Sequence, residues 1–124
     1  MTAIELRIGN WVYNSTTKEN MQVYPMMIPQ LHRIENENGS LEDCNIKPIP
    51  LTEDILLKCG FETSQWDCHS TFRKNICSDG CIVISLEHKH VEIGDLTLDI
   101  EIKYLHQLQN MFYCLCGKEL EINL

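Results

Sequence analysis

The sequence predicts an α+β fold in which a bent, mostly antiparallel sheet packs against a short central helix and a long C-terminal helix. Short apolar stretches separated by turn residues indicate the strands, and two stretches with helical spacing indicate helices at about 52–59 and about 104–116. The length of 124 residues predicts a single domain over residues 1–124.

The composition is typical of a globular protein and argues against several classes of partner. Hydrophobic residues make up 44% and charged residues 23%, and the net charge is −8 without a cluster of Lys or Arg. We therefore expect no direct nucleic-acid binding and no membrane partner, because nucleic acids and anionic membranes attract clustered positive charge. The chain starts without a basic segment followed by an apolar run, and it has no membrane-length apolar stretch, which predicts a cytoplasmic protein.

The N-terminal part is predicted to hold three short strands. They are expected at residues 6–13, 21–28 and, more weakly patterned, 31–34. Gly9 marks a kink in the first strand, and Pro25 confines the second to an edge or a bulge. Short strands at this spacing favour a small, strongly bent, SH3-like sheet.

The central helix at about 52–59 is predicted from its end signals. Thr52 is a good N-cap residue, and Glu53 and Asp54 place negative charge in the first turn, where the helix dipole favours it. Gly60 provides a stop signal after about two turns.

Residues 71–86 are predicted to form a β-hairpin whose register depends on the length of its turn. A three-residue turn at 78–80 puts five apolar residues on one face, whereas a two-residue Asp79-Gly80 turn would divide them between the faces. These residues are Phe72, Ile76, Ile82, Ile84 and Leu86. Burial of a common face favours the three-residue turn, which places Cys77 directly opposite Cys81.

Two further strand regions are predicted toward the C-terminus. Residues 91–93 and 96–102 flank Gly94-Asp95, which is typical of a second hairpin. Apolar and polar residues alternate again over 120–124, which predicts a last strand returning beside the sheet.

The long helix at about 104–116 has the clearest periodicity in the chain. Its apolar side chains fall within an arc of roughly 140° that is predicted to be buried. They are Tyr104, Leu105, Leu108, Met111, Phe112, Leu115 and Cys116. Gly117 follows where a left-handed C-cap is expected.

The opposite side of this helix lacks charge, although a helix face that meets only water usually carries Lys and Glu. It holds His106, Gln109, Asn110 and Tyr113, which we predict to be a binding surface. Two interpretations remain open: an ordinary exposed face partly covered by a loop, or a contact surface for a ligand or protein partner. We favour contact with a second copy of the chain, because an uncharged polar surface costs little to desolvate.

The cysteine and histidine residues raise the question of metal binding. Seven cysteines, an odd number, are expected to be free thiols in a reducing cytoplasm. Cys77, Cys81, His88 and His90 are the zinc candidates, but their spacing departs from the paired cysteines of structural zinc sites, so we expect no cofactor. A Cys–His enzyme built on Cys68 or Cys81 would need an orienting group that the sequence does not indicate.

Several stretches resemble a known group of proteins. They are residues 5–12, 48–53, 60–61, 102–110 and 117–120. Together they resemble small proteins encoded by Bacteroidetes genomes, prophages and mobile elements, a group with no assigned activity. The chain departs from the group's pattern at Cys59, Cys114 and Cys116, where apolar or small residues are expected, and this favours buried thiols. The resemblance implies the cytoplasm of a bacterial host and a phage or mobile-element context.

Three functions follow as expectations. The preferred one is a small, non-enzymatic binding or interaction protein of a phage or mobile element. An alternative is an anti-defence protein that sequesters a nucleotide signal, which would require Arg33, Lys47, Arg73 and Lys103 to converge on one pocket. A second alternative is a zinc-binding protein or an enzyme that uses the Cys and His residues.

Overall fold

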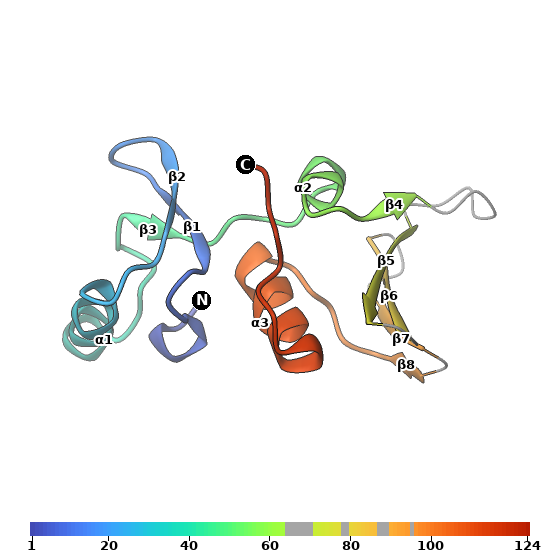
Figure 1. The fold of residues 1–124 in the computed structure, drawn as a ribbon. Coiled ribbons are helices and arrows are strands. Elements are labelled where there is room, and N and C mark those ends of the chain that lie inside the picture. Colours follow the sequence, from blue (N-terminus) through green and yellow to red (C-terminus); the bar gives the residue numbers. More distant parts are fainter. Residues whose placement is uncertain (64–70, 78–79, 87–89, 95) are drawn as a thin grey trace. The chain divides into compact units, whose positions relative to one another are not determined.

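The computed structural model describes residues 1–63, 71–77, 80–86, 90–94 and 96–124. This part of the chain has an α+β fold with two antiparallel sheets and three α-helices, shown in Figure 1. The α+β class is thus confirmed, but the strands are divided between two sheets. The chain separates into two compact units: unit 1 is Met1–Pro50 with Tyr104–Asn110, and unit 2 is Leu51–Lys103 with Met111–Leu124. The single-domain organisation stays a prediction.

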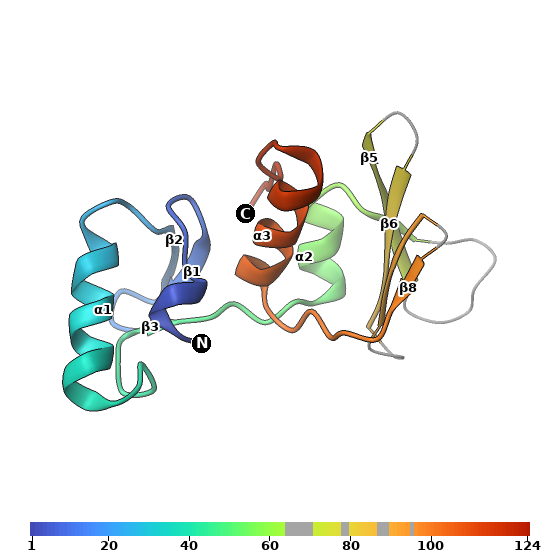
Figure 2. The same ribbon diagram turned by 90° about the horizontal axis from the view of Figure 1, so that it is seen from below.

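Unit 1 contains a three-stranded antiparallel sheet, a short 3-10 helix and an α-helix. Its elements in chain order are η1 (Ala3–Glu5), β1 (Trp11–Asn14), β2 (Glu19–Gln22), α1 (Met27–Asn38) and β3 (Ile46–Lys47). The strand order is β2-β1-β3, and Figure 2 shows α1 alongside this sheet. Apolar side chains from η1, the sheet and α1 form the core of unit 1.

Helix α1 corrects two predictions for the N-terminal part. The expected strand at 31–34 is helical, and the expected strand at 21–28 ends at Gln22. Met27 and Leu31 are buried four residues apart, which is helical spacing, and Gly39 ends the helix with φ 79°. A helix of this length replaces the all-strand, SH3-like arrangement.

Unit 2 contains a five-stranded antiparallel sheet with strand order β4-β5-β6-β7-β8. Its elements are α2 (Glu53–Lys58), β4 (Glu62–Thr63), β5 (Thr71–Cys77), β6 (Gly80–Ser85), β7 (His90–Ile93) and β8 (Leu96–Leu98). The prediction for α2 is confirmed, because the hydroxyl oxygen of Thr52 accepts a hydrogen bond from the Ile55 N–H at 3.3 Å.

The register of the β5–β6 hairpin differs from the prediction. Cys81 pairs with Asn75 rather than with Cys77, and Cys77 pairs with Gly80. The register shifts between Asn75 and Cys77, so one extra residue in β5 moves the pairing. The shared face survives for Phe72, Ile82 and Ile84, which are all buried. Burial of a common face therefore predicted correctly which side chains share a face, but it did not predict which residues of β5 and β6 pair with each other.

Helix α3 (Leu105–Cys116) belongs to unit 1 through Asn110 and to unit 2 from Met111. Its predicted C-cap is confirmed, since Gly117 has φ 69° and donates its N–H to the Tyr113 carbonyl at 2.8 Å. The predicted strand at 120–124 is absent from the described residues. Instead, the Asn123 N–H donates to the Lys58 carbonyl at the end of α2.

Candidate functional site

The buried face of α3 is rotated by roughly 70° from the predicted apolar arc, taking about 100° per residue. Leu105, Leu108 and Phe112 are buried as expected. Gln109 and His106, however, are only 2% and 0% exposed, although both were expected to face a partner. His106 and Gln109 are therefore part of the interior, whereas Gln107 and Asn110 are half-buried.

Gln109 forms hydrogen bonds with backbone groups of the segment that leads into β1. Its side-chain oxygen accepts from the Trp11 N–H at 2.7 Å, and its amide nitrogen donates to the Gly9 carbonyl at 3.2 Å. One side chain thus satisfies a donor and an acceptor of the backbone. Burial of a polar amide is tolerated when both of its ends are paired in this way.

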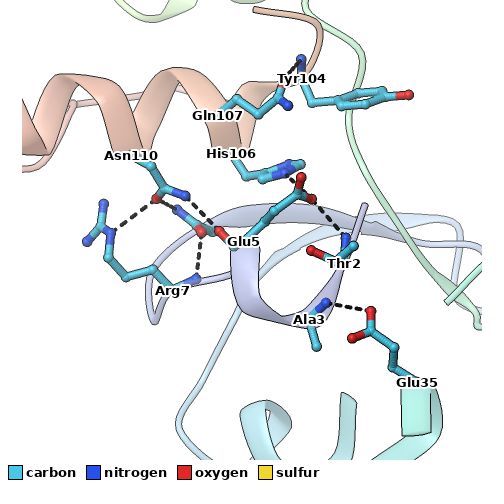
Figure 3. Close-up of polar contacts among 10 residues, drawn as sticks. Thr2, Ala3, Glu5, Arg7, Glu35, Tyr104, His106, Gln107 and Asn110 are labelled. Carbon is cyan, nitrogen blue, oxygen red and sulfur yellow. Dashed lines mark hydrogen bonds and ion pairs between the residues drawn. The ribbon is translucent and has the colours of Figure 1, made fainter. Parts of the chain in front are cut away.

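Asn110 bonds with the same N-terminal segment, as Figure 3 shows. Its side-chain oxygen accepts from the Arg7 Nε at 3.1 Å and from the Asn10 amide at 2.9 Å. Its own amide nitrogen donates to the Glu5 carbonyl at 2.7 Å. Asn110 is therefore occupied within unit 1 and offers little bonding capacity to a partner.

His106 is fully buried and stacks on Tyr104, with ring centroids 5.8 Å apart. Its Nε2 lies 3.7 Å from a carboxylate oxygen of Glu5, and neither ring nitrogen has a hydrogen-bond partner among the described residues. The same oxygen of Glu5 accepts from the Thr2 N–H at 2.8 Å (Figure 3). Burial lowers the pKa of His106, and the Glu5 carboxylate opposes this shift.

Of the four predicted binding residues, Tyr113 is the one that is exposed. It lies in the unit 2 half of α3 beside two further exposed residues, Cys114 and Leu115. Tyr113 is 42% and Leu115 is 39% exposed. We call these three residues the α3 surface. The exposure of Cys114 also corrects the expectation that it is a buried thiol.

The exposure of Leu115 was not expected from the sequence, because Leu115 lay in the predicted buried arc. The buried face of α3 includes Gln109 and His106, and including these two polar residues in the predicted face would have turned it away from Leu115. Their partners are about 100 residues away in sequence, so no local pattern identifies them.

Among the zinc candidates, Cys81 and His90 have side chains within the described residues. His88 and the side chain of Cys77 lie outside the described residues, as does Cys68. Cys81 lies four residues before Ser85, which pairs with His90, so Cys81 and His90 are separated by roughly 13 Å along the sheet. Two ligands of one zinc ion must lie much closer. Within the described ranges, no three Cys, His, Asp or Glu residues are placed to hold a metal ion.

The four cations required for a nucleotide pocket are divided between the two units. Arg33 and Lys47 belong to unit 1, while Arg73 and Lys103 line separate cavities of unit 2. Arg73 shares its cavity with Lys74, a residue that the sequence did not single out.

The comparisons with known proteins found no matching family model, no matching curated protein and no matching solved structure. In the part of the chain that the structure describes, every helix falls short of the length and apolar character needed to cross a membrane.

Proposed function

We propose that the protein is a small, non-enzymatic interaction protein that binds a second copy of itself through the α3 surface. The observation that supports this proposal is the exposure of Tyr113, Cys114 and Leu115 on a helix without a charged side chain. Interfaces are enriched in aromatic residues and depleted of Lys and Glu at their centre. The α3 surface has this composition.

The net charge of the chain favours this particular surface for self-association. Each copy carries −8, so two copies repel one another wherever acidic residues face each other. The α3 surface brings no such charge into the contact. Because Cys114 lies between Tyr113 and Leu115 around the helix, a two-fold axis beside Cys114 would bring the α3 surfaces of both copies together, as two-fold symmetric dimers require.

Sedimentation of charge-inserting variants tests the proposal. We expect the wild type to form dimers, and Tyr113→Glu and Leu115→Glu each to raise the dimer dissociation constant at least about tenfold, because two buried, unpaired carboxylates would result. Thr17→Glu, on an exposed turn of unit 1, adds the same charge elsewhere and should dimerise normally. A wild type that stays monomeric at high concentration would refute the proposal.

Thiol labelling offers an independent test with an internal reference. Cys114 is exposed on the α3 surface, so its labelling should slow as dimers form. Cys59 is buried, and burial raises the pKa of its thiol to about 11, so it should react slowly at every concentration. Labelling of Cys114 that is independent of concentration would place the contact elsewhere.

We also propose that the protein acts in the cytoplasm of a bacterial host, in the context of a phage or mobile element. The resemblance of residues 102–110 and 117–120 to the Bacteroidetes group supports this context. Native mass spectrometry tests the zinc alternative, because a stoichiometric zinc adduct would favour a zinc-binding protein over the simple interaction protein.

A further inference from the structure

Unit 2 has a cationic cavity at the point where β4 meets β5. Its volume is about 380 Å³, and it is lined by Gly60, Glu62, Arg73, Lys74 and Asn75. Pockets for small molecules usually fall within about 300–1,000 Å³ and contain a few polar groups that fix orientation. In a chain with a net charge of −8, two adjacent cations in one cavity create a local region of opposite sign.

The Lys74 ammonium group lies beside Gly60, and both residues line this cavity. A Cβ atom at Gly60 would lie 2.7 Å from the Lys74 Nζ, so the ammonium group approaches the backbone closely at this glycine and would have to shift if a side chain were added. Gly60 also has φ +86°, which suits glycine. The Lys74 ammonium group therefore lies close to the backbone of the residue that follows the C-cap of α2.

Arg73 and Asn75 supply further donors along β5. The Arg73 Nη2 lies 3.7 Å from the Cys81 sulfur, a weak acceptor that leaves most of the guanidinium donors available. In the described part of the chain, no ion pair joins Arg73 or Lys74 to a carboxylate.

The edge of β5 adds backbone groups to this set. β4 pairs with β5 only at Phe72 and Arg73, so residues 74–77 have no strand partner on that side within the described residues. An open strand edge presents N–H groups that can bond to a ligand. The cavity thus combines a guanidinium group, an ammonium group, an amide and backbone donors.

Glu62 limits which anion fits. It lies directly across from Arg73 in the β4–β5 register and lines the same cavity. A carboxylate repels a bare anion but accepts hydrogen bonds from hydroxyl groups. A ligand that carries both a phosphate group and hydroxyl groups satisfies the cations and Glu62 together.

We propose that this cavity binds a sugar phosphate, the chemical class that includes nucleotides. Arg73 and Lys74 bind the phosphate oxygens, Asn75 donates a further hydrogen bond, and Glu62 accepts from the sugar hydroxyls. This site does not depend on self-association through the α3 surface.

Titration of the full chain with ribose 5-phosphate, followed by amide NMR signals, tests the site. We expect saturable shifts at Gly60 and residues 73–75. Arg73→Gln and Lys74→Gln should each weaken binding at least about tenfold, because each removes a charge-assisted hydrogen bond. Arg33→Gln and Lys118→Gln remove cations of the same types from exposed positions elsewhere, and they should change the affinity less than about twofold. Arg73 is exposed, so its variant keeps the test valid if Lys74→Gln is poorly folded.

Two comparison ligands separate the parts of the proposal. Ribose should not bind measurably, and inorganic phosphate should bind more weakly than ribose 5-phosphate. Glu62→Gln should strengthen binding of inorganic phosphate and weaken binding of the ester, because it removes both the repulsion and the strongest hydroxyl acceptor. Absence of saturable shifts, or equal losses in the Arg33 and Arg73 variants, would overturn the site. Equal affinity for phosphate and the ester would overturn the role of Glu62.

Discussion

The two halves of α3 use uncharged polar side chains in opposite ways. In the first half, Gln109 and Asn110 bond with the N-terminal segment, and His106 is buried beside Glu5. In the second half, Tyr113 is exposed at the helix surface. An uncharged helix face can therefore be either buried inside the protein or exposed as a contact surface. The two cases are distinguished by whether its side chains form hydrogen bonds with other parts of the same chain.

The largest expected effect concerns packing in the second half. Phe112 is 7% exposed and Leu115 is 39% exposed, although both lay in the predicted buried arc. Phe112→Ala should lower the free energy of unfolding by about 3–5 kcal/mol, because it removes a buried aromatic ring. Leu115→Ala should cost well under about 1 kcal/mol in the monomer. Urea unfolding measures both, and equal losses would mean that the buried face is assigned wrongly.

The contrast between Phe112 and Leu115 shows how far the sequence predicts this fold. Thr52 correctly predicted α2, Gly117 correctly predicted the end of α3, and the shared face of Phe72 and Ile84 was correct because burial requires it. These features depend on residues close in sequence or on one periodic pattern. Interactions between residues that are close in sequence are therefore sufficient to predict them.

The features that the sequence missed depend on residues that are distant in sequence or on competing signals. Pro25 and the apolar residues after it fit an edge strand as well as a helix start, so α1 was missed. The register shift between Asn75 and Cys77 inserts one residue into β5, and a regular alternation of apolar residues does not locate such an insertion. Gln109 was expected to be exposed but is buried, because the fold brings its partners, Gly9 and Trp11, to it.

A second prediction compares two glutamines of the first half. Gln109→Ala should lower the free energy of unfolding by about 2 kcal/mol, because it leaves the half-buried Trp11 N–H without its partner and removes one of the two side-chain hydrogen bonds that the Gly9 carbonyl accepts. Gln107 accepts from the Tyr104 N–H at 3.1 Å, as a helix-capping side chain does, so Gln107→Ala should cost only about 1 kcal/mol. A loss for Gln107→Ala as large as that for Gln109→Ala would contradict the structural role assigned to the Gln109 amide.

A smaller effect is expected from the titration of His106. Burial lowers the pKa of His106 from its ordinary value of 6.5, while Glu5 opposes the shift and the N-terminal amine assists it. Below pH 6.5 the unfolded chain therefore binds the proton more readily than the folded chain, and stability falls as the pH decreases toward the folded pKa. Unfolding between pH 5 and 8 should show this loss, and His106→Phe should reduce it. An unchanged pH dependence in that variant would assign the loss to other groups.

The most direct test of the difference between the halves is urea unfolding at low and high protein concentration. Dimer formation stabilises the folded chain more as the concentration rises, so the wild-type midpoint should increase. Gln109→Ala should lower the midpoint at both concentrations and keep the increase. Tyr113→Glu should keep the low-concentration midpoint and lose the increase. The reverse pattern, or a wild-type midpoint that does not depend on concentration, would contradict the assignment of the first half to the fold and the second half to self-association.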